Sequence, residues 1–213
     1  SDLREYGTLK GSVELKETGP VTRAVVGNYT MVFGQGLLFY DGFGEFVRPI
    51  LVKDKGPRPD YTSGANDYLR GAAGRVALGP LGLDFFVSEK PLDFPLNPDG
   101  SVNANLDDLH EGSGDVQTLD GLRNNNTVTE QLAGGRVGWG EGPVHGGLSG
   151  YRLHFSRPFN PVDNRFADAR AFRGDELSLV SADFRWKMSP WQFVGEVARS
   201  QADGPEAVRS GGP

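Results

Sequence analysis

No cysteine occurs among the 213 residues of the chain. This absence excludes disulfide bonds, thiolate catalysis and cysteine-ligated zinc. It leaves the compartment open, because cytosolic proteins and secreted bacterial proteins both manage without thiols. Long hydrophobic runs are missing too, since no run approaches the roughly 20 apolar residues of a membrane-spanning helix. No charged-then-apolar leader opens the sequence, so we expect any signal peptide of the parent protein to lie outside this fragment.

Basic residues are fewer than acidic residues in this chain. Lys and Arg number 22 against 28 Asp and Glu, which gives a formal net charge of -6 and a pI near 5.1. Such a chain has no basic surface for a phosphate backbone, so we expect no nucleic-acid partner for this segment. Glycine, by contrast, is abundant: its 31 residues are about twice the usual share of about 7%. These glycines follow no repeat and lie inside apparent strands, which excludes collagen and argues against disorder.

Apolar and polar residues alternate along most of the chain, whereas the spacing typical of helices is scarce. In 177–188, for example, Phe184 lies on the apolar side and its neighbours Asp183 and Arg185 on the polar side. The pattern predicts an all-β protein. The eight predicted strands cover residues 6–16, 23–40, 67–78, 83–88, 127–139, 144–156, 177–188 and 191–197.

The connections between these strands alternate between short and long. The short turns lie near 17–22, 79–82, 140–143 and 189–190, and the long loops cover 41–66, 89–126 and 157–176. Outer-membrane barrels have this arrangement, with short periplasmic turns and longer extracellular loops. Strands of about 10 to 12 residues also suit a tilted membrane crossing. We therefore predict an antiparallel meander of about eight long strands that is part of a larger transmembrane β-barrel.

The direction of the predicted strands has a further consequence. The first connection is a short turn and the last strand rises from one, so both ends of the meander, residues 1–5 and 201–213, are expected on the extracellular side. Bacterial barrels normally begin and end in the periplasm. We therefore expect residues 1–213 to be a fragment of one outer-membrane barrel domain, with the sheet open between its first and last strands.

Aromatic residues gather at both ends of the predicted strands. Tryptophans lie beside the short turns, and Tyr6, Phe39, Tyr40, Tyr68 and Phe155 cluster at the opposite ends, which predicts two aromatic girdles. The residues predicted to face lipid or to lie in a girdle are Tyr29, Met31, Phe33, Trp139, Tyr151, Phe155, Phe184, Trp186, Trp191 and Phe193.

The opposite side of the strands is predicted to line a lumen. Its charges are of both signs, so they can pair across strands and fill a barrel, or line a pore without strong ion preference, and both possibilities stay open. The residues predicted to face the lumen are Lys10, Glu14, Asn28, Asp84, Glu130, Arg136, Arg152, Asp183, Arg185 and Glu196.

Three stretches resemble a known family. GNYTMVFGQGLLFYDGFG (27–44), TVTEQLAGG (127–135) and QFVGEVA (192–198) are similar to the barrel region of large outer-membrane β-barrel proteins of Bacteroidota and related phyla. Proteins of this family often carry helix-hairpin-helix repeats near the N-terminus. The resemblance implies an outer-membrane location and a barrel of more than eight strands, but no defined activity. The matching stretches do not include the helix-hairpin-helix part, so no nucleic-acid function is carried over.

Motifs that indicate an enzyme are weak. GQGLLF (34–39) lacks the third glycine of a dinucleotide loop, and the chain has no nucleophile elbow, zinc-protease helix or P-loop. His154 and Ser156 resemble the His-x-Ser pair of outer-membrane phospholipases, although Arg157 stands where those enzymes have asparagine. Alternation with Tyr151 and Phe155 predicts that His154 and Ser156 point into the lumen, away from phospholipid. We therefore predict no catalytic residue, with a phospholipase as a remote alternative.

The acidic segment 99–115 is a possible calcium site. Asp99, Asp107, Asp108 and Glu111, together with Asp115, supply hard oxygen ligands, but their spacing does not match an EF-hand. A solvated extracellular loop explains the same composition, so we predict no metal and no cofactor.

The sequence thus predicts a non-catalytic barrel protein of the bacterial outer membrane, with a channel, transport or envelope-assembly role. Its expected partners are the lipid bilayer and the remainder of its own barrel. The alternative is a soluble all-β domain that binds a ligand or a partner protein through its long loops. In that alternative the apolar side of the strands is packed inside and the charges face water.

Overall fold

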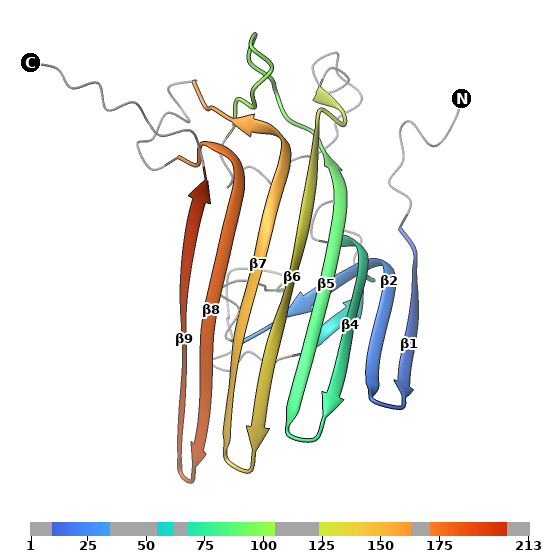
Figure 1. The fold of residues 1–213 in the computed structure, drawn as a ribbon, viewed down its shortest axis with the longest axis vertical. Helices are drawn as coiled ribbons and strands as arrows, with labels where there is room; N and C mark the ends of the chain where they lie inside the picture. The colour runs from blue at the N-terminus through green and yellow to red at the C-terminus, as the bar shows by residue number, and fades with distance from the viewer. Residues whose placement is uncertain (1–9, 35–54, 62–67, 105–123, 163–170, 204–213) are drawn as a thin grey trace, which may run out of the picture.

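The structure is a computed structural model that describes residues 10–34, 55–61, 68–104, 124–162 and 171–203. All nine strands belong to one antiparallel sheet (Figure 1) in the order β1-β2-β4-β5-β6-β7-β8-β9, and β3 pairs with β2 outside this path. Among the described residues, no helix has the length and apolar composition of a membrane span. The strands are β1 (Ser12–Thr18), β2 (Val21–Val32), β3 (Gly56–Pro59), β4 (Leu69–Leu78), β5 (Leu81–Leu92), β6 (Val128–Glu141), β7 (Val144–Phe159), β8 (Gly174–Met188) and β9 (Trp191–Asp203).

The predicted all-β class and antiparallel meander are confirmed. A strand is present at each of the eight predicted places, of which residues 6–9 and 35–40 lie outside the described residues. The sheet is open, because β1 and β9 do not pair with each other in the described part of the chain. The hairpins β1–β2, β4–β5, β6–β7 and β8–β9 turn at the same end of the sheet (Figure 1). The free ends of β1 and β9 lie at the opposite end.

Proline occupies the second position of each of these four short turns. Three of the turns are Gly-Pro pairs that begin at Gly19, Gly79 and Gly142, whose φ angles are 61°, 63° and 57°. A positive φ at the first central residue is what a two-residue hairpin with a following proline requires, and glycine adopts it without a steric penalty. The local sequence therefore favours the observed register in these three hairpins.

Strand β3 was not predicted. Its sequence, GPRP, shows no alternation, and its two prolines suit only an edge position. It lies within the predicted extracellular loop 41–66, but its residues pair with the last residues of β2, from Tyr29↔Pro59 to Val32↔Gly56. In Figure 1 this part of β2 leaves the row of strands and crosses behind it with β3. The described part of this loop thus folds back onto the sheet, which corrects its assignment to the outside.

Gly27 is the last residue of β2 that pairs with β1. Its φ is 112°, and a Cβ atom built on it would lie 2.2 Å from the backbone oxygen of Gly11. We expect Gly27→Ala to destabilise the protein by about 1 to 3 kcal/mol, because the strained φ and the backbone clash cannot both be relieved. The measurement is the denaturant midpoint of the variant and of the unchanged protein. Gly82→Ala is the control, since nothing lies within 4 Å of its added Cβ. Equal midpoints for the two variants would contradict the prediction.

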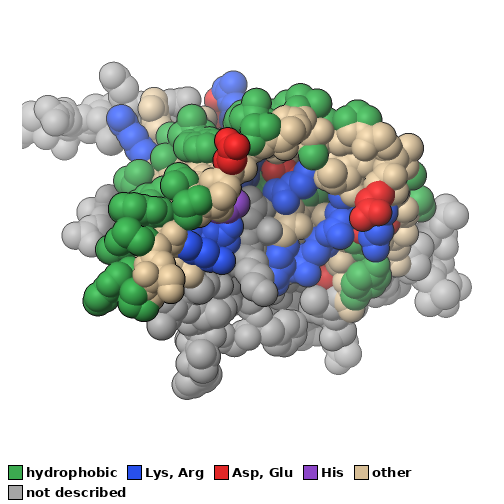
Figure 2. Space-filling model, turned by 90° about the horizontal axis from the view of Figure 1, so that it is seen from below, with side chains coloured by type: hydrophobic (Ala, Val, Ile, Leu, Met, Phe, Trp, Pro, Cys, Tyr) green, Lys and Arg blue, Asp and Glu red, His purple; other side chains and the backbone are tan. Residues whose placement is uncertain are grey.

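The sheet is curved, so it has a convex and a concave face (Figure 2). The convex face carries a belt of exposed apolar side chains in the half of the sheet next to the short turns. Seen from that end, Figure 2 shows hydrophobic side chains along the outer rim of the arch and Lys and Arg side chains within it. Each of the eight long strands contributes at least one residue. This apolar belt consists of Val13, Leu15, Val26, Leu78, Leu81, Phe85, Val87, Val137, Trp139, Val144, Leu148, Val180, Phe184, Trp186, Met188, Trp191, Phe193 and Val197.

The polarity of the two faces is inverted in the other half of the sheet. There the concave face packs into an apolar core, in which Phe33 lies 6.0 Å from Phe86 and Phe155 lies 4.7 Å from Phe159 between ring centroids. The convex face at this level is polar. Its residues include Arg70, Glu89, Gln131, Arg152, His154 and Glu176.

This inversion overturns several predicted positions. Tyr29, Met31 and Phe33 were predicted to face lipid, but they are at most 3% exposed and belong to the concave core. Tyr151 and Phe155 also lie on the concave side, whereas Trp139, Phe184, Trp186, Trp191 and Phe193 lie on the convex side as alternation predicted. The prediction treated each apolar side as outward along its whole length. The strands extend beyond the belt, and there the apolar side points inward.

Arg152 and Asn28 are the corresponding corrections among the polar residues. Both were predicted to face the lumen, but alternation along β7 and β2 puts them on the convex side. The side chain of Arg152 is 63% exposed and pairs with Glu176 of β8. The Asn28 carboxamide oxygen accepts a hydrogen bond from the backbone N–H of Gly11 at 3.1 Å. This bond joins β2 to the residue that directly precedes β1.

Candidate functional site

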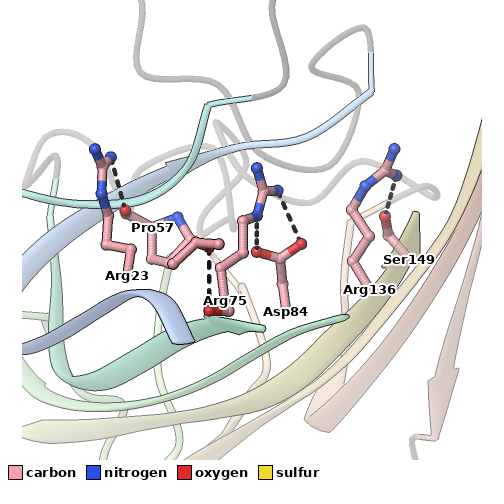
Figure 3. A network of polar contacts seen from close by, with 7 residues as sticks. Arg23, Pro57, Arg75, Asp84, Arg136 and Ser149 are labelled. Atoms are coloured by element: carbon pink, nitrogen blue, oxygen red, sulfur yellow. Dashed lines mark hydrogen bonds and ion pairs between the residues drawn. The ribbon is translucent and has the colours of Figure 1, made fainter. Parts of the chain in front are cut away.

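The concave face next to the short turns gathers charged side chains, and we refer to it as the charged concave face. Arginines of β2, β4 and β6 point to this side in Figure 3. The remaining residues that were predicted to face a lumen lie on the concave side of the sheet or against β3. They are Lys10, Glu14, Asp84, Glu130, Arg136, Asp183, Arg185 and Glu196.

Arg75 and Asp84 form a two-pronged ion pair across the β4–β5 hairpin. Arg75 Nε lies 2.6 Å from one carboxylate oxygen and Nη2 lies 2.9 Å from the other. The side chain of Asp84 is 2% exposed. Bidentate Arg–carboxylate pairs of this kind combine charge with fixed geometry, so Arg75 holds the Asp84 carboxylate in a fixed orientation.

Arg136 makes a second ion pair that spans three strands. Its guanidinium, which starts from β6, donates to Ser149 Oγ of β7 at 2.9 Å and to both carboxylate oxygens of Asp183 of β8. Gly147 makes this reach possible, because a Cβ on Gly147 would lie 2.2 Å from the Arg136 guanidinium. The exposed fractions of the two charged side chains are only 4% and 10%.

The ribbon of β2 and β3 is fastened to the charged concave face by its own contacts. Arg23 of β2 donates to the carbonyl oxygen of Pro57 at 3.3 Å (Figure 3) and lies 3.2 Å from Glu14. Lys10 lies 2.7 Å from Asp60, whose side chain is fully buried. These contacts keep the ribbon across the inside of the arch.

A cavity of about 330 Å³ opens on the charged concave face near the short turns. Arg75, Asp84, Arg136 and Asp183 line it, so both ion pairs form part of its wall. The remaining lining is mostly glycine and small residues, with two further basic side chains. The lining residues not yet named are Thr22, Gly34, Ala77, Pro80, Gly82, Gly138, Trp139, Gly140, His145, Gly146 and Arg185.

His154 and Ser156 lie on the convex side of β7, which corrects their predicted position in the lumen. His154 Nδ1 lies 3.8 Å from Glu176 Oε1, and Ser156 Oγ accepts a hydrogen bond from the N–H of Thr129 at 2.8 Å. His154 and Ser156 therefore lie on the same side of the sheet as the apolar belt, so they do not face away from lipid as predicted. The phospholipase alternative loses that objection and stays a hypothesis.

The acidic segment is described only up to residue 104. Asp99 accepts hydrogen bonds from the N–H and the hydroxyl of Ser101, and these bonds lower the pKa of its carboxyl group. Asp107, Asp108, Glu111 and Asp115 lie outside the described residues. Within the described ranges, no group of three or more His, Asp and Glu side chains could hold a metal ion.

Comparisons with protein-family models, with curated proteins and with solved structures give no match to this chain.

Arg23, Arg75 and His145 were missed among the residues of this face. Arg75 could have been found, because it lies as far before the Gly79–Pro80 turn as Asp84 lies after it, and residues so placed face each other in a two-residue hairpin. His145 was treated as an ordinary strand residue. Its role in the cavity depends on the absence of a side chain at Gly140, its cross-strand partner, and single-strand alternation carries no such signal.

Proposed function

We propose that this chain forms part of the wall of a transmembrane β-barrel in the bacterial outer membrane, with a channel, transport or envelope-assembly role. One observation carries the proposal: large apolar side chains are exposed along the convex face of all eight long strands, while charges gather on the concave face. In water, a continuous apolar belt of this kind is unfavourable and promotes association. Against lipid, the same belt is the expected outer surface of a barrel.

The dimensions of the belt support this proposal. It runs from Leu81 to Val87 on β5 and from Val180 to Met188 on β8, which corresponds to about 20 to 26 Å along the strands at about 3.3 Å per residue. At a strand tilt of about 35 to 45°, this length corresponds to a height of about 14 to 21 Å, which approaches the apolar band of about 25 Å in outer-membrane barrels. Above the belt, the polar convex surface and the apolar core fit a part of the barrel that projects into water.

The open edges of the sheet bear on the same proposal. In a bilayer, unpaired backbone N–H and C=O groups are too costly to remain exposed, so a sheet that spans it must close. The edges of β1 and β9 are not joined to each other. We propose that further strands of the same protein join these two edges and complete the barrel.

The contents of the arch favour selective passage or an assembly role over a wide diffusion pore. The β2–β3 ribbon crosses the concave side, and the apolar core fills the arch away from the short turns. The cavity on the charged concave face is the space left at the other end. A solute that moves along the concave side would therefore meet the ribbon and the apolar core.

Phospholipid hydrolysis is the second candidate function, because the convex position of His154 and Ser156 removes the objection that they face a lumen. A serine nucleophile needs a base that removes its proton, and His154 with Glu176 nearby supplies the required residue types. The discriminating measurement is fatty-acid release from phospholipid vesicles by the full-length protein and by Ser156→Ala. Release that disappears in Ser156→Ala would establish this function, and absence of release from both proteins leaves the first proposal standing.

A cysteine-labelling experiment tests the proposed topology, and residues 1–213 contribute no cysteine of their own. Val162, which is 58% exposed, follows β7 on the side opposite the short turns, whereas Glu141 precedes the Gly142–Pro143 turn. We expect a membrane-impermeant maleimide to label Val162→Cys on intact cells. Glu141→Cys should react only after the outer membrane is permeabilised. Labelling in the reverse order would invert the topology, and labelling of both variants in the cytosolic fraction would refute the proposed location.

A further inference from the structure

Two basic side chains of the cavity have no partner in the described part of the chain. His145 of β7 and Arg185 of β8 are direct cross-strand neighbours and both line the cavity. Arg185 Nε is buried without a hydrogen-bond partner. A buried donor that lacks a partner is costly, so Arg185 Nε indicates a place for an acceptor, and His145 lies beside it.

The charges around this pair favour an anion. Three guanidinium groups line the cavity, those of Arg75, Arg136 and Arg185, against the two carboxylates of Asp84 and Asp183. Each carboxylate is already held by an arginine, Asp84 by Arg75 and Asp183 by Arg136. The positive charge of Arg185 is therefore the one that remains unbalanced among the residues that line the cavity.

The backbone leaves room for a ligand beside these two side chains. Gly140 and Gly146 lie against the rings of neighbouring residues, so that a Cβ on Gly140 would meet His145 Nδ1 at 2.0 Å. By contrast, a Cβ on Gly82 would meet nothing within 4 Å. Gly140 thus leaves space for the His145 ring, and Gly82 leaves open space in the wall of the cavity.

We propose that this cavity binds a small solute through a phosphate or carboxylate group, with Arg185 and His145 as the anchoring residues. Arginine presents N–H groups in a fixed fork that matches the oxygens of both anions. His145 adds a donor from the adjacent strand. The cavity volume of about 330 Å³ exceeds that of an inorganic anion and accommodates the body of a small metabolite. This inference rests on the proposed function, because it makes the cavity a solute site inside the barrel.

The test is calorimetric titration of the full-length protein in detergent with inorganic phosphate, with potassium chloride holding the ionic strength constant. We expect saturable binding that weakens about tenfold or more in the double variant Arg185→Gln/His145→Gln, because two donors to the anion are lost. Arg152→Gln is the matched control, since Arg152 lies on the convex face, and it should bind phosphate like the unchanged protein.

Equal phosphate affinity in the double variant and the unchanged protein overturns the inference, and so does the absence of saturable binding up to about 10 mM. Membrane assembly, measured by heat-modifiable gel mobility, is recorded for each variant. Normal assembly without phosphate binding overturns the anion site alone. Phosphate binding by a protein that does not assemble in membranes overturns the proposed function and leaves the binding site.

Discussion

Placing an arginine at position 184 is expected to prevent normal assembly of the protein in membranes. Phe184 lies in the apolar belt on β8 and is 52% exposed on the convex face. If this face meets lipid near the bilayer midplane, Phe184→Arg costs about 2 to 4 kcal/mol, because the guanidinium must be desolvated or must reach along the strand to water. The measurement is heat-modifiable gel mobility of the full-length protein extracted from membranes.

The control places the same charge on the same face outside the belt. His154 is a convex residue above the belt, and an arginine there would lie beside Glu176. We expect His154→Arg to assemble like the unchanged protein. Arg185→Gln should also assemble, because Arg185 lies on the concave side next to Phe184 in sequence. Equal tolerance of Phe184→Arg and His154→Arg would contradict a lipid-facing belt and favour the soluble β-domain instead.

The sequence was sufficient for the strands and for most of the charged concave face. Alternation and the Gly-Pro turns define each hairpin, and a two-residue turn also fixes which residues face each other, as for Arg75 and Asp84. The same alternation does not say which side is inside. Tyr29 on β2 and Tyr151 on β7 were assigned to lipid because they are apolar, but both lie above the belt and point into the core.

Two features could not be predicted from alternation at all. Strand β3 has no alternation to detect, and it pairs with the residues of β2 that follow Gly27, from Tyr29 to Val32. The ion pair of Arg136 with Asp183 joins two strands that are not neighbours. It requires the curvature of the sheet and the missing side chain at Gly147, neither of which appears in the pattern of a single strand.

The Arg136–Asp183 pair also gives the largest expected effect on stability. Because both side chains are at least 90% buried, Arg136→Met leaves an uncompensated carboxylate among β6, β7 and β8. We expect the free energy of unfolding to fall by about 3 to 5 kcal/mol. The measurement is denaturant unfolding of the full-length protein refolded in detergent.

A double variant and an exposed pair sharpen this prediction. In Arg136→Met/Asp183→Leu no buried charge is left without a partner, so most of the lost stability should return, because replacing a buried ion pair by apolar residues is often neutral. Arg152→Gln, which breaks the exposed pair with Glu176 between two of the same strands, should cost less than about 1 kcal/mol. If Arg136→Met costs no more than Arg152→Gln, Asp183 is solvated without its arginine. The charged concave face would then be a water-filled surface whose charges do not depend on one another.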